Sequence, residues 1–224
     1  MNLHLLDKTV LSIRGNATKF LQGLSSNTPD QPRNAFLNAH GRIIAVFDQV
    51  LAGDDEFLIA VQTAYAQPLT AHLDKFARLN KTTITPSPLQ VYFDLTADAP
   101  LGQEDYAIAQ KHGRILLTRR ILPSTISPGA FTLFRLKYQI PVQGIDYTDE
   151  MVLNVDEHEF VSYTKGCFLG QEPVAKVHSR SKPSWKLIVR YEDELTGEQK
   201  LKLTSRAADP NTGRAKGFIL LPNG

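Results

Sequence analysis

The chain has 224 residues, of which 42% are hydrophobic and 21% are charged, and its formal net charge is +2. These values are ordinary for a globular protein, leave room for one large or two to three small domains, and neither demand nor exclude a polyanionic partner. The single cysteine excludes an intrachain disulfide, the N-terminus lacks the apolar core of a signal peptide, and no apolar run reaches membrane-spanning length. We therefore expect a cytoplasmic protein with no membrane contact.

The first 85 residues alternate between strand and helix patterns. Asn16 is expected to cap the first helix through its side chain. The turn at residues 53–56 carries three acidic residues, which we interpret as a solvated turn rather than a metal site. The order of elements predicts a ferredoxin-like split βαβ unit. Strands are expected at residues 9–13, 34–39, 42–51, 57–61 and 82–85, and helices after residue 16 and around residues 65–76.

Two proline-containing breaks, at residues 86–88 and 123–128, divide the rest of the chain. The whole pattern predicts an α+β protein in three parts: a ferredoxin-like unit at 1–85, a second α+β unit at 86–180 and a short β domain at 181–224. The further strands are expected at residues 90–95, 106–109, 114–117, 185–191, 201–204 and 217–221, with a helix at 131–138.

The most informative stretch is residues 165–172, Lys-Gly-Cys-Phe-Leu-Gly-Gln-Glu, which we call the cysteine motif. Gly166 and Gly170 permit backbone angles closed to other residues and so allow an exposed turn. Lys165 is an adjacent cation that favours the thiolate over the thiol. The helical pattern that follows places Cys167 just before a helix N-terminus, where the helix dipole also favours an anion. The alternative is that Cys167 is a small buried hydrophobic residue.

The cysteine motif resembles the signature of the YgfZ-type folate-binding proteins, which are relatives of the glycine-cleavage T-protein. Residues 13–23, residues 36–44 and the stretch through Arg135, Pro141 and Gly144 resemble the same family, in the same order. The resemblance implies two α+β domains and a C-terminal β-barrel around a central channel, with the third domain abbreviated in this chain. It also implies that tetrahydrofolate or a derivative is the cofactor. The implied role is to build or repair iron–sulfur clusters of selected enzymes, including tRNA-modifying ones.

The resemblance also implies roles for single residues. Cys167 is the expected reactive residue and Lys165 its electrostatic activator. The glycines of the motif would shape its turn, and the residues that close the motif would orient it. The expected cofactor-binding residues are Gly166, Gly170, Gln171, Glu172, Arg135 and Lys137.

Two positions argue against aminomethyl transfer, which is the reaction of the T-protein relatives and the main alternative function. The essential aspartate of those relatives falls on Ala45 or Val46, neither of which can act as an acid or base, and Asp48 is out of register. Their folate-reading glutamate falls on Lys137, which cannot accept hydrogen bonds from pterin N–H groups. We therefore expect a protein that is not a classical enzyme and that binds folate weakly, with Lys137 available to pair with a folate carboxylate.

The cysteine and the histidines do not form a recognisable metal site. The six histidines show no His-x-x-x-His pair, and one thiolate cannot hold an iron–sulfur cluster that needs about four cysteine ligands. His158 and His178 flank Cys167 and could approach it, although a surface or structural role is the commoner one for a histidine. Any cluster at Cys167 must therefore be shared with a partner protein or with a thiol cofactor.

A basic stretch follows the cysteine motif. We favour a solvated face for it, with a folate polyglutamate tail, RNA phosphates or an acidic protein as alternative partners. Trp185 is expected to be a core anchor at the start of a strand rather than to stack on a ligand. Iron–sulfur client or assembly proteins are the expected macromolecular partners, and a folate-binding or RNA-associated module without chemistry is a further alternative. The basic residues are Lys176, His178, Arg180, Lys182 and Lys186.

Overall fold

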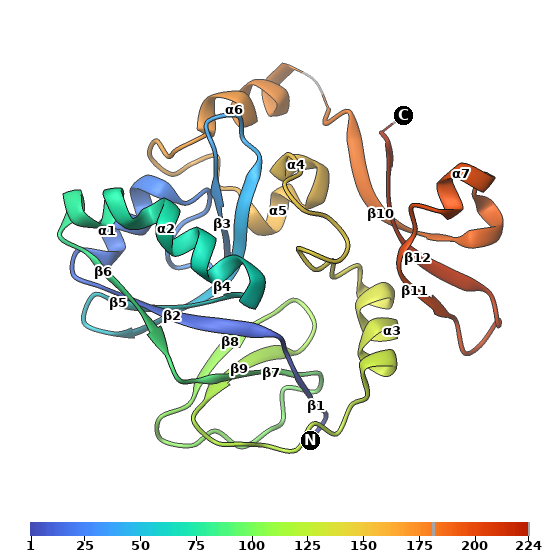
Figure 1. The fold of residues 1–224 in the computed structure, drawn as a ribbon, viewed down its shortest axis with the longest axis horizontal. Coiled ribbons are helices and arrows are strands. Elements are labelled where there is room, and N and C mark those ends of the chain that lie inside the picture. The colour runs from blue at the N-terminus through green and yellow to red at the C-terminus, as the bar shows by residue number, and fades with distance from the viewer. Residues whose placement is uncertain (181, 224) are drawn as a thin grey trace.

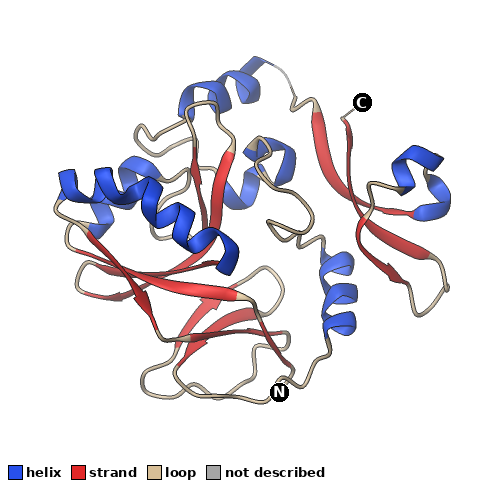
Figure 2. Ribbon diagram, in the orientation of Figure 1, coloured by secondary structure: helices blue, strands red, loops and turns tan. Residues whose placement is uncertain are grey.

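The computed structural model describes residues 1–180 and 182–223, which form an α+β structure (Figures 1 and 2). Their strands make three antiparallel sheets, in the orders β3-β4-β5-β2-β6, β1-β7-β9-β8 and β10-β12-β11. No helix in these residues is long and apolar enough to cross a membrane. The strands are β1 (Leu3–Leu5), β2 (Lys8–Arg14), β3 (Arg33–Leu37), β4 (Ile43–Gly53), β5 (Glu56–Gln62), β6 (Thr83–Ser87), β7 (Gln90–Asp94), β8 (Tyr106–Ala109), β9 (Arg114–Thr118), β10 (Trp185–Tyr191), β11 (Thr204–Ala208) and β12 (Ala215–Pro222). The helices are α1 (Ala17–Leu24), α2 (Thr63–Asn80), α3 (Pro128–Tyr138), α4 (Val152–Val155), α5 (Glu157–Phe160), α6 (Gln171–Arg180), the 3-10 helix η1 (Glu192–Glu194) and α7 (Gly197–Lys200).

The five-stranded sheet has the strand order of a ferredoxin-like unit, with β3 added at one edge. Strand β2 lies between β5 and β6, and β5 pairs with β4 on its other side. Helices α1 and α2 pack on this sheet around a core that includes Phe20, Phe47 and Leu69 (Figure 1). The α+β arrangement predicted from the alternation of strand and helix patterns is therefore confirmed.

The N-terminal cap of α1 comes from a distant turn. Asp55, between β4 and β5, accepts hydrogen bonds from the backbone N–H groups of Ala17 (3.1 Å) and Thr18 (2.8 Å), and the bond from Thr18 is the main cause that lowers the pKa of Asp55. Asn16 instead donates its side-chain amide to the backbone carbonyl of Asn80 (2.8 Å). The prediction that Asn16 caps α1 is wrong, because the carboxylate of Asp55, 38 residues beyond Ala17, accepts the free N–H groups instead.

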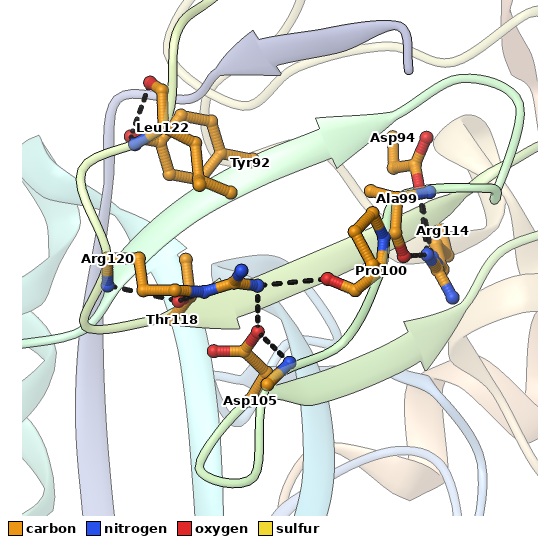
Figure 3. Close-up of polar contacts among 10 residues, drawn as sticks. Tyr92, Asp94, Ala99, Pro100, Asp105, Arg114, Thr118, Arg120 and Leu122 are labelled. Carbon is orange, nitrogen blue, oxygen red and sulfur yellow. Dashed lines mark hydrogen bonds and ion pairs between the residues drawn. The ribbon is translucent and has the colours of Figure 1, made fainter.

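The four-stranded sheet takes its edge strand β1 from the N-terminus, where it pairs with β7. Two arginine–aspartate pairs pin the loop between β7 and β8 (Figure 3). Arg114 bonds to Asp94 (3.0 Å), whose carboxylate also accepts the N–H of Ala99 (2.9 Å). Arg120 pairs with Asp105. Burial opposes the charged form of Asp105, but hydrogen bonds from Thr118 and from the N–H of Gly102, with a smaller effect of Arg120, lower its pKa.

A buried ion pair joins the C-terminal sheet to the rest of the protein. Arg135 on α3 donates to the carboxylate of Asp146 (2.7 Å) and to the hydroxyl of Ser205 in β11 (2.6 Å). Asp146 also accepts hydrogen bonds from the hydroxyls of Ser205 (2.6 Å) and Thr204 (2.9 Å). These bonds, and the apolar core to which Phe218 belongs, hold the small three-stranded sheet against the rest of the protein. The predicted domain boundaries at residues 85 and 180 stay a prediction.

We expect Asp146→Ala to lower the free energy of unfolding by about 3–5 kcal/mol, because it leaves the Arg135 guanidinium buried without its counter-charge. Asp149→Ala is the matched control, since Asp149 pairs with Arg42 on the surface and its loss should change stability by less than about 1 kcal/mol. Chemical denaturation of both variants measures the difference. Equal effects would contradict the structural role of the buried pair.

Candidate functional site

Cys167 is a free, exposed cysteine on the loop between α5 and α6. The alternative of a buried structural cysteine is therefore wrong. The loop borders an open pocket of about 550 Å³, which we call the thiol pocket. Its other walls are the start of α1, the β4–β5 turn and the end of α2. The residues that share this pocket with Cys167 include Asn16, Thr18, Lys19, Asp55 and Asn80.

Lys165 anchors the loop instead of lying exposed beside the thiol. Its side chain is buried, and its ammonium group donates hydrogen bonds to the backbone carbonyls of Ser25 (2.6 Å) and Asn27 (2.9 Å), just beyond the C-terminus of α1. The same group lies 5.3 Å from the centre of the Phe168 ring. Burial lowers the pKa of Lys165 to about 8. An electrostatic effect of Lys165 on Cys167 stays a prediction.

Two glycines let the cysteine motif pack closely against the β3–β4 hairpin. Gly170 has a φ of +84°, and a Cβ placed on it would lie 2.3 Å from the backbone carbonyl oxygen of Asn38. Gly41 at the hairpin turn has a φ of +72°, and a Cβ there would lie 2.9 Å from the side chain of Val174 on α6. The hairpin and the motif are separated by more than 100 residues in the sequence. They therefore pack so closely that neither glycine has room for a side chain.

Two further predictions for the cysteine motif concern the helix that follows it and the backbone of Gly166. Helix α6 begins at Gln171, so Cys167 precedes a helix as expected. Gly166 does not use the backbone freedom that a glycine permits, because its φ lies outside the left-handed region and nothing lies within 4 Å of a Cβ placed on it. Glu172 is exposed in the first turn of α6.

The two histidines near the motif bind to other groups. His178 stacks on the ring of Tyr163, with 3.7 Å between ring centres, and its Nδ1 lies 3.4 Å from the carboxylate of Glu157. Tyr163 also donates its hydroxyl to Glu157 (3.2 Å), and His158 lies at the other carboxylate oxygen (3.8 Å). Within the described residues neither histidine has a hydrogen bond or ion pair with Cys167, and no group of three or more His, Cys, Asp or Glu side chains could hold a metal ion.

A second hollow, the central cavity, also measures about 550 Å³ and is lined from all three sheets. The β8–β9 turn contributes Lys111 and His112, and His112 stacks on Tyr138 at the end of α3 with ring centres 3.9 Å apart. The abbreviated C-terminal sheet still supplies one wall, through Lys186 and Phe218. None of the described residues that line this cavity also lines the thiol pocket.

Arg33 stands at the inner wall of the central cavity. Its guanidinium lies 3.6 Å from Asp48, 3.4 Å from Glu159 and 4.6 Å from the centre of the Phe160 ring. Its Nε is buried without a hydrogen-bond partner among the described residues. Lys8 and Gln110 also bond to Asp48, so this carboxylate is held from three sides behind the cavity wall.

None of the six residues expected to bind a cofactor lines the central cavity. Gly166 lies at the thiol pocket, and Arg135 is occupied by its buried ion pair. Lys137 is exposed, with its ammonium 5.0 Å from the centre of the Tyr138 ring. Their cofactor roles stay predictions. The cavity residues escaped the sequence analysis because they come from segments far apart in the chain; only the basic stretch around Lys186 gave a signal.

No acidic side chain stands at the position of Ala45 or Val46, where the T-protein relatives carry their essential aspartate. Ala45 is buried in the core under α1 and α2, and Val46 is buried on the opposite face of β4 among apolar side chains. Asp48 follows Val46 on the same face, where Lys8 and Arg33 neutralise it.

A crystal structure of glycine cleavage system aminomethyltransferase T from Bartonella henselae superposes with a TM-score of 0.67, covering 99% of this chain and 78% of that protein at 12% sequence identity. The chain has the T-protein fold. This identity is low, so the likeness concerns the fold alone.

The proteins that the chain resembles in sequence have a different named function from the protein that it resembles in fold. This T-protein-like chain is 27% identical over 218 residues to iron-sulfur cluster assembly factor IBA57, mitochondrial, of Mus musculus, and 24% identical over 209 residues to the IBA57 homolog, mitochondrial, of Pyricularia oryzae. The matches cover 76% and 79% of the chain, but only 60% and 53% of those relatives. No family model matches the chain.

We expect Gly170→Ala to destabilise the T-protein-like fold by at least about 1–2 kcal/mol, because alanine is strained at a positive φ and its Cβ would collide with the carbonyl of Asn38. Gly166→Ala, four residues earlier, should change stability by no more than about 0.5 kcal/mol, since space is open there. Denaturant titration compares the two variants. A neutral Gly170→Ala would contradict the close fit between the motif and the hairpin.

The buried ammonium of Lys165 gives a pH signature. With a folded-state pKa of about 8 against 10.5 for an exposed lysine, the folded protein releases this proton before the unfolded chain does. The free energy of unfolding of the wild type, relative to Lys165→Met, should therefore rise between about pH 8 and pH 10.5. Denaturation at several pH values measures this difference. A difference that stays flat or falls over this window would show that Lys165 is not buried as described.

Proposed function

We propose that this protein is an accessory factor in the assembly or repair of iron–sulfur clusters, with Cys167 as its functional thiol. The observation that carries the proposal is an exposed thiol on a loop that is itself fixed by a buried lysine and by Gly170. The similarity to two iron–sulfur cluster assembly factors supports the process, and the YgfZ-type motif supports Cys167 as the residue that takes part in it.

Thiolate sulfur is a soft ligand that suits iron–sulfur clusters, which need about four such ligands. Cys167 therefore acts with thiols of a second molecule, either an iron–sulfur client or assembly protein or a thiol cofactor. Its place on an open pocket leaves room for that second molecule. On the resemblance to the YgfZ-type family, the clients are selected enzymes that include tRNA-modifying ones.

A reduced folate is the proposed ligand of the central cavity. The volume of about 550 Å³ lies in the range of small-molecule sites. The stacked rings of His112 and Tyr138 offer an aromatic wall, and Lys111 beside them is an exposed cation of the same cavity. These groups fit an aromatic ligand that carries carboxylates. When bound, a reduced folate supplies a carrier for one-carbon groups.

Aminomethyl transfer is not part of this proposal, although the fold is that of an aminomethyltransferase. A proton acceptor at the position of Ala45 or Val46 is missing, and both side chains are buried among apolar groups. The carboxylate of Asp48 lies behind the cavity wall and is held by Lys8, Arg33 and Gln110.

The test is complementation of cells that lack their own factor of this kind, with the activity of iron–sulfur enzymes as the readout. Cys167→Ser should stay folded, with a stability change of no more than about 0.5 kcal/mol, because the side chain is exposed. It should nevertheless lose support of those enzymes, since a hydroxyl is a poor soft-metal ligand and a poor nucleophile at neutral pH. Thr164→Ala, exposed in the same loop, is the control and should keep activity. Full activity of Cys167→Ser would contradict the proposal.

A further inference from the structure

The loop that carries Cys167 is tied at its base to a residue of the central cavity. Glu157, the first residue of α5, lines this cavity. Its Oε2 accepts a hydrogen bond from the hydroxyl of Tyr163 (3.2 Å), which lies ahead of Cys167 in the loop between α5 and α6. Burial, and the carboxylate of Glu157 beside it, raise the pKa of Tyr163, so its hydroxyl stays protonated and donates. The contact therefore joins the loop to a cavity whose described lining includes no residue of the loop.

The same carboxylate reaches the helix that follows the loop. His178 on α6 has its Nδ1 3.4 Å from Oε2 of Glu157, and its ring stacks on that of Tyr163 with 3.7 Å between ring centres. Tyr163 stands before Cys167 in the chain and His178 stands after it. The carboxylate and the two stacked rings therefore close the base of the cysteine loop, and we call Glu157, Tyr163 and His178 the clasp.

The clasp is built to open more easily than the other anchors of the loop. The side chains of Glu157 and His178 are 29% and 47% exposed, whereas Lys165 is buried. Both contacts to the carboxylate are longer than the roughly 2.7–2.9 Å of a strong charge-assisted hydrogen bond. A cationic or N–H group of a ligand in the cavity would compete with Tyr163 and His178 for this carboxylate by making such a bond.

We infer that Glu157 is a positioning residue for Cys167: from the wall of the central cavity it closes the cysteine loop through Tyr163 and His178, and withdrawal of its carboxylate loosens the loop. Lys165 and Gly170 hold the loop independently, so the effect is local loosening rather than unfolding. The importance of the clasp for function rests on the proposed role of Cys167, whereas the existence of the clasp does not.

The experiment is amide hydrogen exchange of the full chain, followed by mass spectrometry in peptides that cover residues 161–170. The N–H of Ser162 donates to the carbonyl of Ser26 (2.9 Å) and is a protected reporter at the base of the loop. Glu157→Ala takes the carboxylate away from both rings, and Tyr163→Phe removes only the hydroxyl. We expect either substitution to speed exchange of the loop about three- to tenfold, as the loss of one or two hydrogen bonds would give. A nitroxide attached to Cys167, the only cysteine of the chain, should become more mobile in the same variants.

Three further variants separate the clasp from a general effect on α5. His158→Ala is the matched control, because His158 is the neighbour of Glu157 and lies 3.8 Å from the other oxygen of the same carboxylate, yet does not belong to the clasp; it should leave loop exchange unchanged. Glu157→Gln keeps an acceptor for the Tyr163 hydroxyl and should restore slower exchange than Glu157→Ala. The double variant of Glu157→Ala with Tyr163→Phe should exchange no faster than Glu157→Ala alone, because both changes break the same bond.

The outcomes separate this inference from the proposed function. Loop exchange that stays unchanged in Glu157→Ala, or that His158→Ala raises equally, overturns the inference. An equal rise in β11 (Thr204–Ala208) also overturns it, because the change would then be a general loss of stability. Exchange does not depend on the chemistry of the thiol, so faster loop exchange in Glu157→Ala together with full activity of Cys167→Ser supports the clasp and contradicts the proposed function.

Discussion

The contact between Gly170 and the carbonyl of Asn38 is the constraint on which the site depends. At 2.3 Å from a would-be Cβ, this approach excludes every side chain, and it fixes the start of α6 against the β3–β4 hairpin. Lys165 fixes the other end of the same loop by donating to two carbonyls at the end of α1. Cys167 lies between these anchors, so an exposed thiol is held on a loop whose two ends are buried or tightly packed. A reactive side chain on such a loop has a fixed position and remains accessible to a partner.

The thiol and the central cavity are separate places in the fold. No described residue lines both, and the motif residues Gly166 and Cys167 line the thiol pocket alone. A ligand in the cavity would therefore not need to touch Cys167. The cavity is bounded by three sheets, and the buried Arg135–Asp146 pair keeps the C-terminal sheet in position to close it. The proposed function uses this separation, because it assigns a small molecule to the cavity and a second protein or thiol to Cys167.

The features that depend on local sequence patterns could be predicted from the sequence. Alternation of apolar residues predicted the ferredoxin-like unit, and the glycine-flanked motif predicted an exposed cysteine before a helix. Three features depended on contacts across the fold and were missed. Asp55 replaced Asn16 as the cap of α1, Lys165 turned inward to distant carbonyls, and the cavity gathered Arg33, Lys111 and Lys186 from segments that no local pattern connects. The sequence also did not distinguish Gly170, which the close approach of Asn38 requires, from Gly166, where space is open, because the neighbours of a glycine in space are known only from the fold.

The central claim is that the native fold presents Cys167 to solvent on an anchored loop. The most direct measurement is the rate at which an alkylating reagent labels the native protein near neutral pH, followed through increasing denaturant below the unfolding transition. The account predicts ready labelling in the absence of denaturant and a rate that hardly changes until the protein unfolds, because access does not require opening. Labelling that is absent from the native protein and rises in step with global unfolding would contradict it.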